Sequence, residues 1–256
     1  TGSLRLAHSE ERLQEFKRAA SMGKYQGMDI EILTPEEAKS LYPFLETHDL
    51  AGALYDPNDG DIDPAQLTQA LAKGARDLGA KILRFTPAIG VTQKNDKTWT
   101  VHTEKGDINC QYVVNAAGYY AQQVGEWFKP YGGRTVPMMV MSHQYLLSEE
   151  IPEIENYAKK SGKKLPLLRD VDISYYLRQE KNGFNLGPYE PNCKAHWATE
   201  DDPMPDDFSF QLWNDDLDRI EDIVADAMER VPLLGTSGVS RIINGPIPYA
   251  PDGLPL

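Results

Sequence analysis

Val113-Val114-Asn115-Ala116-Ala117-Gly118 is the most informative segment of this 256-residue chain, because an apolar run leads directly into small residues and a glycine. Residues 112–115 are predicted to form a buried strand, and residues 120–127 a helix. Small residues at a strand-to-helix turn allow a backbone to approach a bound cofactor, since larger side chains would collide with it. Taken alone, the pattern is equally typical of a tight turn that binds no ligand.

The segments before this turn alternate between strand and helix patterns. Ser9 is predicted to cap a helix that runs to about Met22. Thr34-Pro35-Glu36-Glu37 combines an N-cap, a proline at the first helical position and a capping box. Pro64 opens an amphipathic helix that Gly79 stops. The predicted strands on this side are residues 3–7, 51–55, 81–85 and 99–103.

From about Thr135 onward, the pattern favours strands. They are predicted at residues 140–147, 174–178, 184–187 and 239–244, and a helix is predicted at 217–231, where Pro232 closes it. The order of elements predicts an α/β (α+β) fold in which α/β flanks surround a β-rich module.

The charge and hydropathy of the chain exclude some classes of partner. The net charge of −13 opposes binding to nucleic acid, because it repels phosphate backbones and no local basic patch offsets it. No apolar run reaches the roughly 20 residues of a membrane helix, so no membrane span is expected. The acidic stretch 200–226 lacks the spacing of a metal-binding loop and is interpreted as solvated surface, so no metal site is predicted.

Only two cysteines occur, Cys110 and Cys193, and neither belongs to a CxxC pair. This usage favours two free thiols in a reducing compartment. The N-terminus shows no secretion signal, although the chain does not begin with Met and an upstream targeting segment would not be visible. The expected location is the cytoplasm, or the mitochondrial matrix if the source is eukaryotic.

Two further segments support a cofactor at the turn. Asp59-Gly60-Asp61-Ile62-Asp63-Pro64 with the helix after it, and Asn244-Gly245-Pro246 with Pro251-Asp252-Gly253-Leu254-Pro255, resemble segments of flavin enzymes of the D-amino-acid oxidase superfamily. Within that superfamily the chain is most similar to dimethylglycine and sarcosine dehydrogenases. The segments that carry this similarity are Gly2-Ser3-Leu4-Arg5-Leu6-Ala7, Ser142-His143-Gln144-Tyr145, Leu168-Arg169-Asp170, Ser174-Tyr175-Tyr176-Leu177-Arg178-Gln179-Glu180, Gly187-Pro188-Tyr189-Glu190 and Asp216-Leu217-Asp218-Arg219-Ile220.

The resemblance implies a partial FAD-binding α/β domain and a substrate-binding domain that is rich in β-sheet. Residues 1–50 and 135–238 are expected to belong to the substrate domain. Residues 51–134 and 239–256 are expected to belong to the FAD-binding domain. The implied reaction is oxidation of the N-methyl group of a small amino acid such as dimethylglycine or sarcosine, with hydride transfer to FAD. The iminium product is then hydrolysed or passes its one-carbon unit to folate in the full-length protein.

The resemblance also assigns roles to particular residues. His143 is the first catalytic candidate, and Tyr176 and Tyr175 are the next, one of which faces the site because neighbouring strand residues alternate. Tyr176 is favoured as the inward residue. Arg178 is a candidate for binding the substrate carboxylate, with a structural ion pair as the alternative. The implied FAD-binding residues are Ala88, Ala116, Ala117, Gly118, Tyr120, Gly245 and Pro246.

No G-x-G-x-x-G loop occurs in the chain. In the resembling family this phosphate-binding loop lies upstream, as does the histidine to which FAD is often covalently attached. We therefore expect the chain to be an incomplete piece that is inactive by itself. Two alternatives stay open: a catalytically inactive module that binds a small amino acid or a partner chain, and an oxidase that uses oxygen on another secondary amine. The sequence does not identify the electron acceptor.

Overall fold

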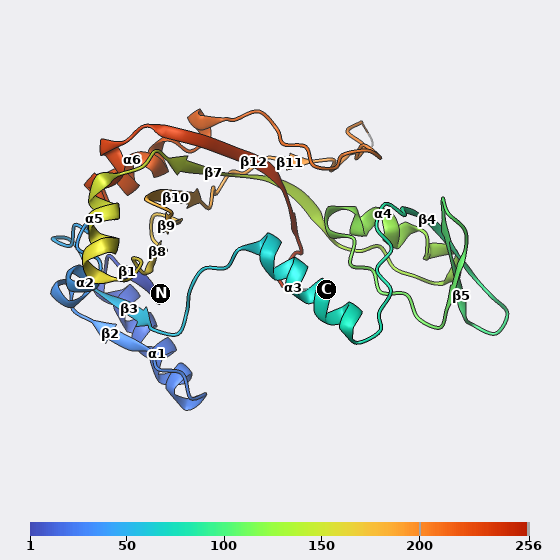
Figure 1. Cartoon of the computed structure of the whole chain (residues 1–256), viewed down its shortest axis with the longest axis horizontal. Helices are drawn as coiled ribbons and strands as arrows, with labels where there is room; N and C mark the ends of the chain where they lie inside the picture. The colour runs from blue at the N-terminus through green and yellow to red at the C-terminus, as the bar shows by residue number, and fades with distance from the viewer. Residues whose placement is uncertain (200, 255–256) are drawn as a thin grey trace. The chain divides into compact units, whose positions relative to one another are not determined.

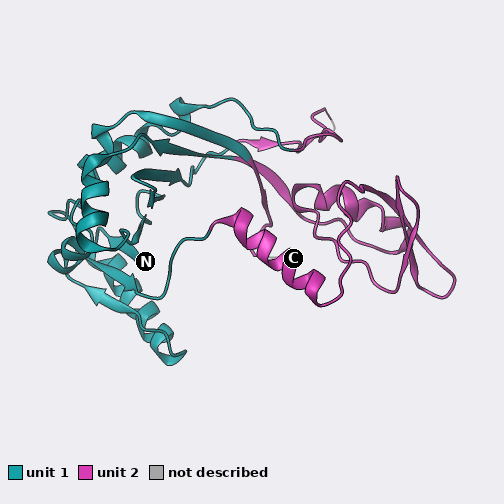
Figure 2. Ribbon diagram, viewed as in Figure 1, with its two compact units in different colours: residues 1–62, 143–193, 210–245 teal, residues 63–142, 194–209, 246–256 magenta. Residues whose placement is uncertain are grey.

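The chain folds into two compact units in a computed structural model that describes residues 1–199 and 201–254. Unit 1 comprises residues 1–62, 143–193 and 210–245, and unit 2 comprises residues 63–142, 194–209 and 246–256 (Figure 2). Each unit is therefore assembled from segments that are distant in sequence. Glu200 of the acidic stretch and Pro255 of the C-terminal loop lie outside the described residues.

Unit 1 is built on a mixed β-sheet (Figure 1). The strands run in the order β7-β10-β9-β8-β1-β3-β2, and β12 also pairs with β7. Strands β1 and β8 are parallel, whereas β9 pairs antiparallel with both β8 and β10. The strand bounds are β1 (Ser3–Ala7), β2 (Glu31–Leu33), β3 (Gly52–Asp56), β7 (Met139–Ser148), β8 (Leu167–Asp170), β9 (Tyr175–Glu180), β10 (Gly183–Pro188) and β12 (Val239–Tyr249). The first residues of β7 and the last residues of β12 belong to unit 2.

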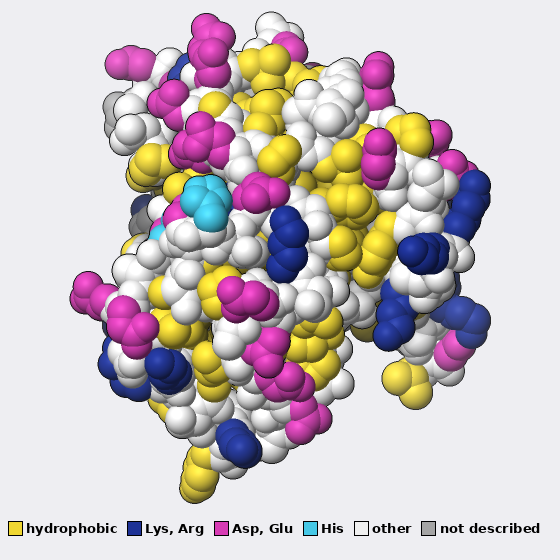
Figure 3. Space-filling view, turned by 90° about the vertical axis from the view of Figure 1, so that its left-hand side faces the viewer, with side chains coloured by type: hydrophobic (Ala, Val, Ile, Leu, Met, Phe, Trp, Pro, Cys, Tyr) yellow, Lys and Arg dark blue, Asp and Glu magenta, His cyan; other side chains and the backbone are white. Residues whose placement is uncertain are grey.

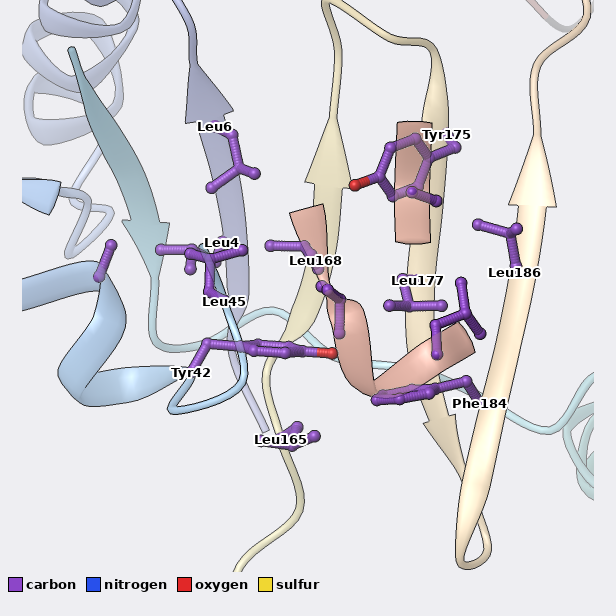
Figure 4. Close-up of a cluster of buried hydrophobic side chains, with 14 of the residues drawn as sticks. Leu4, Leu6, Tyr42, Leu45, Leu165, Leu168, Tyr175, Leu177, Phe184 and Leu186 are labelled. Atoms are coloured by element: carbon purple, nitrogen blue, oxygen red, sulfur yellow. The ribbon is translucent and has the colours of Figure 1, made fainter. Parts of the chain in front are cut away.

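One face of this sheet forms the hydrophobic core. Strands β8, β9 and β10 alternate between the two faces, so Leu168, Leu177 and Leu186 are buried together. Tyr42, Tyr175 and Phe184 fill the space among these leucines (Figure 4). Burial of one leucine side chain contributes roughly 2 kcal/mol, and truncation of Leu177 to alanine would cost about 2–5 kcal/mol. Core residues also come from helices α2 (Pro35–Leu41), α5 (Pro152–Ser161) and α6 (Glu221–Arg230).

Helix ends follow the local signals in the sequence. The Ser9 hydroxyl accepts a hydrogen bond from Arg12 N at the start of α1 (Glu10–Tyr25). Thr34 and Glu37 form the predicted capping box at the start of α2. Helix α5 and the short strands β2 and β8 were absent from the sequence-based prediction. Strand β8 has four residues and is held by pairing with β1, which a local pattern does not reveal.

Unit 2 contains helices α3 (Pro64–Asp77) and α4 (Ala121–Glu126) and a three-stranded sheet. That sheet has the order β4 (Ala88–Gln93), β5 (Trp99–Thr103) and β6 (Ile108–Cys110), with antiparallel pairing. Trp99 packs edge-to-face against Phe128 and Tyr131, with ring centroids 5.1 and 5.4 Å apart. Strand β11 (Ala195–His196) pairs with the first residues of β7.

Two strand predictions in unit 2 were wrong. Residues 81–85 form no strand, and the chain pairs with β5 only from Ala88 onward. Residues 112–115 have no strand partner among the described residues, and Val114 is 85% exposed rather than buried. Helix α3 likewise contains no buried residue, so its apolar residues Leu67 and Leu71 are exposed. An apolar run becomes a buried strand only when another strand pairs with it, and no described residue of the chain does so here.

No helix of the described residues is long and apolar enough to span a membrane. Acidic side chains are spread over the molecular face drawn in Figure 3, while lysine and arginine side chains gather mainly toward its edges.

Candidate functional site

A glycine seats the side chain of Tyr176 on the face of the unit 1 sheet opposite the core. Tyr176 on β9 is the register partner of Gly187 on β10. A Cβ atom at residue 187 would overlap Cε1, Cζ and Oη of the tyrosine. The ring therefore lies over the glycine backbone, where any larger residue would displace it. Tyr176 is half-buried in this position.

Three rings come together on this face. Tyr189 stacks on His143, with centroids 5.8 Å apart and an interplanar angle of 26°. It also lies against Tyr176, with centroids 5.8 Å apart and an angle of 57°. Because 44% of Tyr189 is exposed, this contact contributes little to the core, and it leaves the ring available to a ligand. We call His143, Tyr176 and Tyr189 the aromatic set.

The sequence prediction named His143 and Tyr176 but missed Tyr189. The signal was present, since residues 187 and 189 lie two apart at the end of a strand and thus face the same side. Tyr189 N donates a hydrogen bond of 2.7 Å to Ser174 O, which holds the end of β10 beside the start of β9.

The environment of His143 favours the neutral imidazole. Burial lowers the pKa of His143 below its usual range, and the positive charge of Arg219 lowers it further. Arg219 is itself held by an ion pair with Glu190, whose side chain is 2% exposed. Burial raises the pKa of Glu190 despite this partner. His143 is thus neutral at neutral pH and carries a free lone pair on one ring nitrogen.

Tyr176 keeps its proton at neutral pH. Burial, followed by the effect of Tyr189, raises the pKa of the Tyr176 phenol, although Arg178 and Arg169 oppose this shift. A protonated phenol donates a hydrogen bond, whereas a neutral imidazole also offers an acceptor. The aromatic set therefore provides hydrogen-bond donors and an acceptor nitrogen beside three ring faces.

Tyr175 lies on the other face of β9, inside the core, and is 1% exposed. This placement corrects the prediction of Tyr175 as a catalytic candidate. Neighbouring strand residues face opposite sides of the sheet, so the Tyr175 side chain points away from the aromatic set. Figure 4 shows its ring among the core leucines. Arg178 shares the face of Tyr176 and forms ion pairs with Glu180 at 3.2 Å and Asp61 at 3.5 Å. The observed contacts of Arg178 thus match the alternative of a structural ion pair, and substrate binding by this residue stays a prediction.

The predicted cofactor residues of unit 2 lie on an open bend. Asn115 Nδ2 donates a hydrogen bond of 2.8 Å to Ala121 O, and Asn115 Oδ1 accepts one from Ala117 N at 3.3 Å. Gly118 has φ +60°, and no atom lies within 4 Å of the position a Cβ would take. Ala116 is also exposed. Exposed backbone flanked by small residues fits the close approach of a dinucleotide such as FAD.

The remaining cofactor candidates differ in their surroundings. Tyr120 donates a hydrogen bond of 2.9 Å from its hydroxyl to Phe208 O and is thereby tied into unit 2. Ala88 is exposed at the start of β4. Gly245 belongs to unit 1, where a Cβ would lie 3.2 Å from Leu212 Cδ2, and Pro246 belongs to unit 2. Their contact with FAD stays a prediction. Among the described residues, no group of three His, Cys, Asp or Glu side chains is arranged to hold a metal ion.

Comparison with known proteins identifies relatives along the whole chain. The family model DAO, described as FAD dependent oxidoreductase, matches residues 1–256. Mitochondrial dimethylglycine dehydrogenase of Mus musculus is 39% identical over 259 residues, which cover 100% of this chain and 29% of that protein. Mitochondrial sarcosine dehydrogenase of the same species is 35% identical over 260 residues, which cover 100% of this chain and 26% of that protein.

A solved structure supports the same fold. L-proline dehydrogenase from P. horikoshii superimposes with a TM-score of 0.80 at 25% sequence identity, over 100% of this chain and 62% of that chain. The two dehydrogenases from Mus musculus are longer proteins, and the chain spans under a third of the length of each.

Proposed function

The chain belongs to the DAO family of FAD-dependent oxidoreductases, and from this premise we propose that the protein containing it oxidises the N-methyl group of a small amino acid. Dimethylglycine and sarcosine are the proposed substrates, because enzymes named for them are 39% and 35% identical to the chain. FAD, when bound, accepts the hydride that leaves the methyl carbon.

The aromatic set is the observation that carries this proposal. Ring faces attract methylated ammonium groups, and sites that recognise such groups are commonly cages of aromatic side chains. His143 and Tyr176 both lie 5.8 Å from Tyr189, measured between ring centroids. This spacing places three rings within reach of one small cation. A substrate nitrogen bearing methyl groups is therefore the ligand that the set fits best.

His143 is proposed to accept the proton of the substrate ammonium on a ring nitrogen. Oxidation of an amine requires its lone pair, so the ammonium must be deprotonated before the hydride leaves. A neutral imidazole in a partly buried site performs this step, and the lowered pKa of His143 keeps it neutral. Tyr176 is proposed to orient the substrate through a hydrogen bond from its hydroxyl.

Unit 2 is proposed to hold part of the FAD through the backbone of residues 115–118. Ala88 and Tyr120 are proposed to contact the same bound dinucleotide. Two observations support additional flavin-binding structure in the full-length protein. The chain spans 29% of its dimethylglycine dehydrogenase relative, and apolar residues of unit 2 such as Leu71 and Val114 are exposed. Folate binding by the full-length protein is a further proposal, which rests on the sequence resemblance alone. A mitochondrial matrix location, if the source is eukaryotic, is proposed because both dehydrogenases are named as mitochondrial.

Anaerobic reduction of the flavin tests this function. Full-length protein with bound FAD is mixed with sarcosine, dimethylglycine or 4-methylaminobutanoate, and bleaching of the flavin absorbance is followed. We expect at least one of them to reduce the flavin, and His143→Ala to slow that reduction by about 100-fold. Binding of these amines without any flavin reduction would instead indicate an inactive amino-acid-binding module and would refute the proposal.

A further inference from the structure

Three arginines lie beside the aromatic set on the same face of the unit 1 sheet. Arg5 on β1 is the register partner of Arg169 on β8, and Arg169 is the register partner of Tyr176 on β9. Register partners on neighbouring strands project from the same face. Arg178 follows Tyr176 by two residues and shares this face as well. A chain with a net charge of −13 therefore concentrates positive charge next to its aromatic set.

These arginines differ in the partners they have. Arg178 is engaged by Glu180 and Asp61. Within residues 1–199 and 201–254, no carboxylate lies within 4.0 Å of the Arg169 guanidinium, and its buried Nε has no hydrogen-bond partner. The positive charges of Arg169 and Arg5 act on the pKa of Asp59 at longer range. Burial raises the pKa of Asp59, but hydrogen bonds and these two charges lower it overall.

A buried guanidinium nitrogen without an acceptor is costly, and structures rarely keep one unless a ligand or water completes it. The Tyr176 ring leans over Gly187 on β10, which is the side away from β8. The ring is therefore displaced toward β10 and not toward the Arg169 guanidinium on β8. Neighbouring strands lie about 4.8 Å apart, so the side chains of the register partners Tyr176 and Arg169 are close enough for one small ligand to contact both.

We propose that Arg169 binds the carboxylate of the amino-acid substrate whose methylated nitrogen lies against the aromatic set. The inference rests on the proposed function and names the residue that selects an amino acid over a plain amine. The planar guanidinium matches a carboxylate with two parallel hydrogen bonds, which a neutral amide does not reproduce. Arg169 is thus a specificity residue, in place of the sequence-predicted Arg178.

The test compares a carboxylate with its amide in full-length protein that contains FAD. Methoxyacetate resembles the substrate in size and carboxylate but has no oxidisable nitrogen, and its binding is measured by titration calorimetry. Arg169→Met is expected to weaken methoxyacetate binding by about 10- to 100-fold, the range for a hydrogen bond to a charged group. It should also bring kcat/KM for dimethylglycine close to that for N,N-dimethylglycinamide. Arg169→Lys, which keeps the charge but loses the paired geometry, should give an intermediate loss.

The matched control is Arg18→Met, which removes an exposed arginine of α1. Arg18→Met should bind methoxyacetate as the wild type does. Arg169 variants that bind methoxyacetate like the wild type would overturn the inference, as would an equal or larger loss in Arg178→Met. A separate outcome is that no N-methyl amino acid reduces the flavin of the wild type, while methoxyacetate binding still requires Arg169. In that case the proposed function fails and the carboxylate site stands.

Discussion

Replacing Gly187 with alanine is expected to lower turnover by about 100-fold while leaving unit 1 folded. The added Cβ would overlap the outer ring atoms of its register partner Tyr176. Contacts between carbons need about 3.5–4.0 Å, so the ring must move by roughly 1 Å or more. Displacement of a positioned group by about 1 Å costs on the order of 100-fold in rate.

The effect on stability should be much smaller. The overlapping atoms belong to the far end of a side chain that is half-buried, and Tyr176 avoids them by rotating away at a cost of about 0.5–1.5 kcal/mol. Alanine in a strand regains about 0.5–1 kcal/mol relative to glycine. The free energy of unfolding should therefore change by less than about 1 kcal/mol. The large loss of activity and the small change in stability separate this effect from misfolding.

Flavin reduction by a saturating N-methyl substrate is measured by stopped flow, and stability by thermal unfolding. Gly90→Ala is the matched control, because Gly90 also lies in a strand and no atom stands within 4 Å of its added Cβ. A double mutant that adds Tyr176→Phe should be no slower than the slower of the two single mutants, since both changes act on one ring. Turnover of Gly187→Ala within threefold of the wild type would refute the seating of Tyr176 over Gly187.

Four further predictions address unit 1. Arg230, 7% exposed, donates two hydrogen bonds of 2.6 and 2.8 Å to the half-exposed Asp49, so Arg230→Met should lower the free energy of unfolding by about 1.5–3 kcal/mol in denaturant titration. The hydrogen bond from Arg230 lowers the pKa of Asp49 from 3.8 to about 2, so wild-type stability should be fully present above pH 4 and fall by on the order of 1 kcal/mol toward pH 2. An unchanged acid slope in Arg230→Met would contradict the pairing. Tyr42 has a buried hydroxyl with no hydrogen-bond partner among the described residues, so Tyr42→Phe should leave thermal stability equal or higher by up to about 1 kcal/mol, and a clear loss would reveal a partner. Arg219→Met should move the acid limb of the kcat/KM profile to higher pH, because burial and Arg219 together lower the pKa of His143, and a limb that stays in place would exclude His143 as its source.

Local signals predicted the helix starts well. Ser9 and the Thr34-Glu37 capping box are correct because a cap depends on backbone groups within one turn. Strand predictions were less successful, as at residues 112–115, because a strand depends on a partner that is distant in sequence. The sequence shows only that this run is apolar. Whether another strand pairs with it depends on the tertiary structure.

The candidate site shows the same division. The alternation of side chains along a strand places Tyr176 and Tyr175 on opposite faces of β9, and the core position of Tyr175 agrees with it. The resemblance to a known family supplied His143. Neither source identified Tyr189, although alternation after β10 places it on the face of Gly187. Neither source distinguished Arg169 from Arg178, because that distinction depends on which residue of β8 lies opposite Tyr176.

By itself, the sequence determined the family, the capped starts of helices α1 and α2 and the two faces of β9, because each follows from residues that are near one another or from an extended match to relatives. The tertiary structure decided that Gly187 accommodates the ring of Tyr176, that Tyr189 joins it to His143, and that Arg178 is paired while Arg169 Nε is not. These features arise from strand register and burial. Both are set by contacts between segments that lie far apart along the chain.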